Sequence, residues 1–240
     1  MVTRAAGRPL AFLLSIALLA VTAGAAAAAT TPFPQDFSFD ERGVRADAYW
    51  QTCEEPDTEG VTRCVTISAS LFDGRQHNRD PEFGHVNNAF SYLCVHRMED
   101  AYAEDFGPVG EPISEGGCLL HPDITVDGLD LVEVSTNLDL VQEVCVVVDP
   151  ETGETICEPG ASRTVSVDLT LTGTGELVTD RWVSNGTSIV DGVRCHMRSA
   201  SAGTGRDASA SIQVGEEDPG ASQFAFLSDG RTRMAQRCAG

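Results

Sequence analysis

Apolar and polar residues alternate with a period of two in several segments of this chain. Residues 165–171 place Val and Leu at every second position, with hydroxyl and acidic side chains between them, and the pattern recurs over 65–71 and 44–50. This alternation predicts strands with one buried face. No window has the spacing of a long amphipathic helix. The nearest, 98–106, predicts one or two helical turns in a connection.

Further segments predict strands at 90–97, 124–134, 138–148, 177–183, 192–198, 209–214, 223–227 and 232–238. Five pairs of a turn-forming residue with glycine predict turns: Asp73-Gly74, Asp127-Gly128, Asn185-Gly186, Asp191-Gly192 and Asp229-Gly230. Many short strands with glycine-rich turns predict an all-β fold, which we interpret as a disulfide-stapled antiparallel β-sandwich.

The order of sequence features suggests an internal repeat. Twice, two cysteines flank an acidic turn, an alternating strand follows, then a strand with Cys and His, then a last cysteine. The later spacings do not match, so duplication and a single unrepeated fold both stay open. If the repeat is real, we expect two related sandwich-like halves, 42–136 and 137–240, after a leader segment at 30–41.

The N-terminal residues have the order of a secretory signal. Arg4 and Arg8 precede an apolar run at 10–21, and small residues follow at 25–29. We expect a signal peptide at 1–29, of a kind typical of bacteria, that is removed to leave a secreted, extracellular protein with no membrane attachment. The alternative is an uncleaved anchor, because a membrane-spanning helix needs about 20 apolar residues.

Eight cysteines in an exported chain predict a disulfide framework, because bridges persist in oxidising compartments. Two pairs sit on opposite arms of predicted hairpins, and the proposed repeat supplies the other two. We therefore expect sequential bridges: Cys53–Cys64, Cys94–Cys118, Cys145–Cys157 and Cys195–Cys238. No cysteine pair has the close spacing of a zinc site, and the acidic stretches lack EF-hand spacing, so we expect no metal and no cofactor.

Charge narrows the range of partners. The formal net charge is -20, and all sixteen basic residues are arginine. Such an acidic chain is expected to repel nucleic acid and anionic membrane surfaces. The last quarter of the chain is near neutral, whereas the preceding part is strongly acidic.

Six basic residues share faces of two predicted strands near the C-terminus. They are Arg194, His196 and Arg198 on one strand, and Arg231, Arg233 and Arg237 on the other. A bridge between Cys195 and Cys238 would make these strands neighbours. Guanidinium groups bind carboxylate, phosphate or sulfate in a bidentate manner, so the pattern predicts a surface for anions or an acidic partner. The alternative is a solvated face, or a face whose arginines pair with internal acidic residues.

Segment 73–88 is predicted to be a polar loop. It carries His77 and His85, with the carboxylates Asp80 and Glu82, and histidine beside a carboxylate suits acid–base chemistry. The chain has no G-x-S-x-G and no H-E-x-x-H motif. We therefore expect a non-catalytic extracellular module with a binding or structural role, whose partner is an unknown extracellular protein or glycan. The alternatives are a secreted hydrolase using His77 or His85 with Asp80 or Glu82, and a secreted inhibitor or effector.

Overall fold

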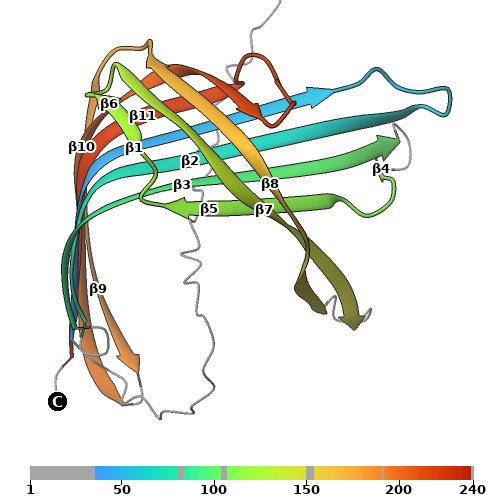
Figure 1. The fold of residues 1–240 in the computed structure, drawn as a ribbon. Coiled ribbons are helices and arrows are strands. Elements are labelled where there is room, and N and C mark those ends of the chain that lie inside the picture. The colour runs from blue at the N-terminus through green and yellow to red at the C-terminus, as the bar shows by residue number, and fades with distance from the viewer. Residues whose placement is uncertain (1–35, 81–83, 104–106, 150–153, 191, 239–240) are drawn as a thin grey trace, which may run out of the picture. The chain divides into compact units, whose positions relative to one another are not determined.

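The computed structural model describes residues 36–80, 84–103, 107–149, 154–190 and 192–238. These residues form antiparallel strands and no helix (Figure 1), which confirms the all-β prediction. The strands are β1 (Phe37–Cys53), β2 (Val61–Asp80), β3 (Gly84–Ala103), β4 (Gly107–Pro108), β5 (Ile113–Leu120), β6 (Ile124–Asp127), β7 (Leu131–Asp149), β8 (Glu154–Gly173), β9 (Val178–Val190), β10 (Val193–Val214) and β11 (Phe224–Cys238). The described part of the chain therefore contains no helix that could span a membrane.

One prediction of local structure is wrong. The helical turns expected over 98–106 are not formed, because 98–103 belongs to β3 and pairs with 61–66 of β2. The remaining residues, 104–106, lie outside the described residues. Pairing with a neighbouring strand supplies the backbone hydrogen bonds that an isolated helical turn would leave partly unsatisfied.

The strands form one continuous sheet whose pairings close into a ring. Its path runs β11-β1-β2-β3-β5-β7-β8-β10, and β10 pairs with β11 to complete it. β10 does this with two segments, since 208–214 pairs with β8 and 195–207 pairs with β11. β7 runs through the boundary expected at residues 136 and 137, so the sheet is continuous there.

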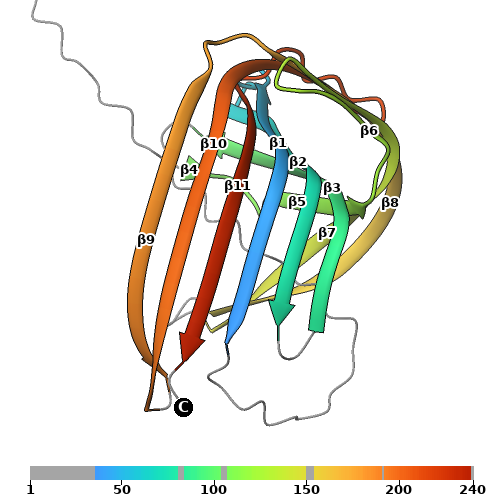
Figure 2. The ribbon, with the colours of Figure 1, turned by 90° about the vertical axis from the view of Figure 1, so that its left-hand side faces the viewer.

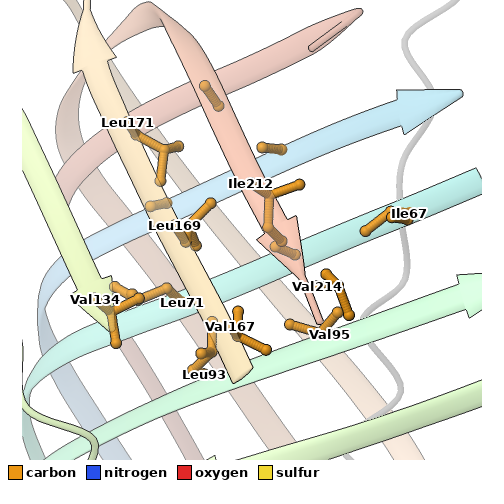
Figure 3. Packing of buried hydrophobic residues seen from close by; sticks show 14 of the residues in the cluster. Ile67, Leu71, Leu93, Val95, Val134, Val167, Leu169, Leu171, Ile212 and Val214 are labelled. Atoms are coloured by element: carbon orange, nitrogen blue, oxygen red, sulfur yellow. The ribbon is translucent and has the colours of Figure 1, made fainter. Parts of the chain in front are cut away.

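The hydrophobic core lies inside this ring, where β8 and β10 cross over β1, β2 and β3 (Figure 3). Its members come from every second position of the strands, as the period-two pattern predicts. Val167 and Leu171 of β8 are fully buried, as are Leu71 of β2 and Leu93 of β3. Burying each such side chain contributes roughly 1.5–3 kcal/mol, so packing between the crossed strands is the main stabilising contribution.

Four glycines form a row across adjacent strands where the sheet bends. Gly203 of β10, Gly230 of β11, Gly43 of β1 and Gly74 of β2 are successive register partners. A Cβ on Gly43 would overlap the carbonyl oxygen of Asp73, and one on Gly74 would lie 2.7 Å from the Cα of Gly43. These strands approach so closely that only glycine fits at the bend.

This bend corrects the turn predictions. The dipeptides Asp73-Gly74 and Asp229-Gly230 lie inside β2 and β11, where the strand bends without reversing, and Asn185-Gly186 lies inside β9. The Asp127-Gly128 turn is present between β6 and β7, with a positive φ of 57° at Gly128. A turn-type dipeptide therefore allows the backbone to bend, and pairing with neighbouring strands determines whether the chain reverses there or continues as a bent strand.

Beyond the glycine row, six strands continue side by side (Figure 2). We call this part the sheet extension, in the strand order β9-β10-β11-β1-β2-β3, and it comprises residues 181–190, 193–202, 231–238, 37–42, 75–80 and 84–89. Two expectations change here. β1 begins at Phe37, so part of the leader 30–41 is a strand, and most of the loop expected at 73–88 is paired strand.

Disulfides join register partners in neighbouring strands. The structure contains Cys53–Cys64, Cys94–Cys118 and Cys195–Cys238, which are three of the four pairs expected from the sequence. The fourth expected pair occupies opposite register positions in β7 and β8. These bridges indicate an oxidising compartment.

Candidate functional site

The site begins with a row of arginines that crosses the sheet extension next to the glycine row. Directly opposed residues in paired strands point to the same side of a sheet. Arg42 of β1 is the register partner of both Arg231 in β11 and Arg75 in β2. Arg181 of β9 joins the same row, because it pairs with Ala202, which in turn pairs with Arg231.

Further arginines lie on the same side of the sheet extension, at positions two or more residues beyond this row and separated from it by an even number of residues. We call the surface the arginine face, and its nine arginines are Arg42, Arg75, Arg79, Arg181, Arg194, Arg198, Arg231, Arg233 and Arg237. All nine are exposed. His196 shares this face as the register partner of Arg237. The face thus contains all six residues of the predicted anion surface, together with four arginines that sequence reasoning missed.

Two of the nine arginines are held by a carboxylate on the same face. Arg231 donates two hydrogen bonds to Asp40, one of them from Nε at 2.6 Å, and Arg233 Nε donates another at 3.2 Å. Hydrogen bonding by Arg231 lowers the pKa of Asp40 below its usual value, so this carboxylate is ionised at neutral pH. For these two arginines, the alternative of pairing with internal acidic residues holds.

The other seven arginines of the face have no ion-pair partner among the described residues. By contrast, every arginine that the structure describes elsewhere is ion-paired. The pairs are Arg45–Glu41, Arg63–Asp57, Arg97–Glu217, Arg163–Glu115 and Arg206–Asp130. In a chain with a net charge of -20, carboxylates are abundant, so seven unpaired arginines on one face are a marked segregation of charge.

Neighbouring residues set the boundary of the arginine face and fix the strands that carry it. Asp73 and Asp229 lie on the same side in the next row at the bend, so the basic surface ends there. His196 Nδ1 lies 3.0 Å from the hydroxyl of Thr187 in β9, within hydrogen-bonding distance. The Cys195–Cys238 bridge ties β10 to β11 at the far end. Strand pairing and the bridge therefore fix the backbone positions from which these arginines project.

Sheet geometry sets the spacing of the guanidinium groups. Neighbouring strands lie about 4.8 Å apart, and residues on one face of a strand recur about every 6.7 Å. Such spacing allows one extended ligand to contact several arginines at once, each through a bidentate contact to a carboxylate, sulfate or phosphate group. A single small anion would use only a fraction of this surface.

The residues of the hydrolase alternative lie on β2, on β3 and between them. His77 of β2 lies on the arginine face as the register partner of Asp40, and position 85 of β3 is opposite Arg79. Glu82 lies outside the described residues, as do the side chains of Asp80 and His85. Within the described residues, no group of three potential metal ligands comes together.

A cavity of about 390 Å³ lies on the opposite side of the sheet, at the bend. Its lining includes the buried Glu41, which accepts a hydrogen bond from Arg45, and the rings of Phe72 and Phe226. Arg45 also stacks over Phe72, with its guanidinium carbon 5.2 Å from the ring centroid. In a straight strand, residues four apart lie about 13 Å from each other. Glu41 and Arg45 meet because the strand bends at Gly43, which no sequence pattern indicates.

Comparison with known proteins does not assign a family. No family model matches the chain, and no curated protein matches it. Among solved structures, the chain is similar to an enduracididine biosynthesis enzyme, MppR, complexed with the condensation product of pyruvate and imidazole 4-carboxaldehyde. That similarity has 9% sequence identity and a TM-score of 0.20, and it covers 86% of this chain and 90% of that one. Likeness at this level carries no argument about function.

Proposed function

We propose that this protein is a secreted, non-catalytic binding module whose arginine face binds an acidic glycan bearing sulfate or carboxylate groups. The observation that carries the proposal is the pairing pattern of the arginines. Seven exposed arginines on one face lack carboxylate partners, whereas those elsewhere in the described chain are ion-paired. The disulfides support an oxidising environment, as expected of a secreted module.

The overall charge favours a glycan over a nucleic acid as the ligand. Nucleic acid carries a dense, uniform negative charge, which a chain of net charge -20 repels at long range. A glycan with spaced anionic groups can engage the arginine face while less charged sugar units pass the acidic rim at Asp73 and Asp229. Binding is expected to weaken as salt rises, because exposed charges are screened.

Substitution of the unpaired arginines tests the proposal. Arg42→Ala combined with Arg75→Ala removes two adjacent members of the first row and leaves the Asp40 pairs intact. Loss of two charge-assisted contacts, at about 1 kcal/mol or more each, is expected to weaken binding at least tenfold. The measurement is equilibrium binding to a sulfated polysaccharide and to a polyuronate, compared with their uncharged counterpart at constant ionic strength.

Arg63→Ala is the matched control, because Arg63 is also an exposed strand arginine but lies outside the arginine face and pairs with Asp57 at 3.6 Å. This variant is expected to bind like the unsubstituted protein. Equal binding by the Arg42 and Arg75 double variant would refute the proposal. So would equal affinity for charged and uncharged glycans.

A further inference from the structure

The sheet extension ends at β9, whose outer edge is open. Among the described strands, β9 pairs only with β10, and it does so along its whole length of 13 residues without a register shift. Its sequence contains no proline and no lysine, which commonly protect edge strands, and the uninterrupted register means that no bulge protects it. An edge of this kind presents unpaired backbone groups that can template another strand.

Apolar side chains are exposed along the same strand. Val178, Trp182, Val183 and Ile189 are between 44% and 69% exposed. Its only charged residues, Asp180 and Arg181, cancel each other. β9 is therefore a neutral, partly apolar edge on a strongly acidic protein, and it is the kind of edge that two like-charged molecules can share.

We propose that two copies of this chain associate by antiparallel pairing of β9 with β9 about a two-fold axis. This inference does not depend on the proposed glycan ligand. A two-fold pairing that uses every residue from Val178 to Val190 must place its axis at Ser184, because 184 is the midpoint of 178 and 190. Each residue of one copy then lies opposite the residue of the other copy for which the two residue numbers add up to 368.

The same register is complementary in its side chains. It places Trp182 of each copy opposite Gly186 of the other, on one side of the sheet. A Cβ at Gly186 would meet no atom within 4 Å, so the space above this glycine is open, whereas Trp182 is a large exposed ring. An aromatic side chain packed across a glycine is a recognised means of stabilising a strand pair. Arg181 lies opposite Thr187 and Asp180 opposite Ser188, so no like charges face each other.

The dimer would extend the ligand surface described above. Because opposed residues point to the same side, the arginine faces of both copies would lie on one side of a single continuous sheet. A long polyanion could then contact both faces at once, which raises its apparent affinity without a new contact.

Self-association of the full-length, disulfide-intact secreted protein tests this inference. Sedimentation velocity over about a hundredfold concentration range is expected to show a monomer–dimer equilibrium. Association should strengthen as salt rises, because screening reduces repulsion between two acidic copies. Trp182→Lys and Gly186→Glu are each expected to weaken association at least tenfold. Leu120→Lys, at a 60% exposed position on β5, is the control and is expected to leave it unchanged.

The double variant, Trp182→Lys with Gly186→Glu, distinguishes this register from a general loss of folding. In the proposed dimer, the substituted lysine of one copy lies opposite the substituted glutamate of the other, so association should recover. Within one chain, the two positions are about 13 Å apart along the strand and do not pair. The proposal is overturned if the protein is monomeric at every concentration, if the double variant associates as weakly as either single one, or if Leu120→Lys has an equal effect.

Discussion

Replacing Arg97 with leucine is expected to destabilise the fold more than replacing any exposed, weakly paired arginine. Arg97 is at the end of the core in β3, and its side chain is only 11% exposed. Its Nε lies 3.0 and 2.8 Å from the two carboxylate oxygens of Glu217, and its Nη2 lies 3.2 Å from Oε2 of Glu99. Glu115, which is 10% exposed, is a third partner at 3.6 Å.

The expected loss in the free energy of unfolding depends on how the three carboxylates are solvated or paired once Arg97 is removed. Removing one partner of a buried ion pair costs about 3–5 kcal/mol when the other is left buried and unpaired. Here Glu99 and Glu217 are about two-fifths exposed and can rehydrate, and Glu115 keeps its hydrogen bonds from Arg163. We therefore expect a loss of about 2–3 kcal/mol in the free energy of unfolding. For a domain of this size, that corresponds to roughly 4–12 °C in Tm.

The assay is chemical and thermal unfolding of the oxidised protein, followed by circular dichroism and tryptophan fluorescence. Arg63→Leu is the matched control, because Arg63 pairs with Asp57 at 3.6 Å while its side chain is 55% exposed. This control is expected to change the free energy of unfolding by less than about 1 kcal/mol. The reasoning fails if Arg97→Leu unfolds within about 0.5 kcal/mol of the unsubstituted protein, or if the control loses as much stability.

Two further predictions concern the bend and acid stability. Gly43→Ala is expected to destabilise the fold by roughly 1–3 kcal/mol, because the added methyl overlaps the carbonyl of Asp73. Gly186→Ala meets no atom of its own chain and should be neutral at a concentration where the protein is monomeric. Denaturant midpoints measured at that concentration compare the two variants, and equal midpoints would contradict this account. The hydrogen bond from Arg163 lowers the pKa of Glu115, so its stabilising contribution is complete above the ordinary value near 4.5 and is lost as pH falls through the lowered value in the folded state. Unfolding midpoints measured from about pH 6 to 3 should therefore fall in the acidic range, and Glu115→Gln should reduce that slope.

Strands with a strict period of two were predictable from the sequence, because alternate residues of such a strand face the core and are apolar, while the others face solvent. In 165–171 of β8, the four apolar residues are buried, as the alternation requires. Strand lengths were not predictable. The segments expected at 192–198 and 209–214 are parts of the single strand β10, because its middle section pairs with β11 and contributes no core residue that a hydrophobicity pattern would reveal.

The candidate site was partly predictable for a related reason. Arg194 and Arg198 alternate along one strand, so their common face was evident from the sequence. Arg42 and Arg181 are isolated arginines in their own segments, and no local pattern links them to Arg231. They join one row because β1 and β9 lie on either side of the β10–β11 pair, and the pairing of β1 with β11 brings together Arg42 and Arg231, which are 189 positions apart in the chain (231 minus 42).

The sequence by itself indicated the all-β class and the alternation of buried and exposed residues, because both follow from local spacing, and it ranked correctly the three disulfides that the described residues form. Only the tertiary structure decided that paired glycines bend four strands together, that a loop expected at 73–88 is largely paired strand, and that nine arginines share one face. These features depend on which strands become neighbours, and that order is selected by burial of the whole core rather than by any single segment.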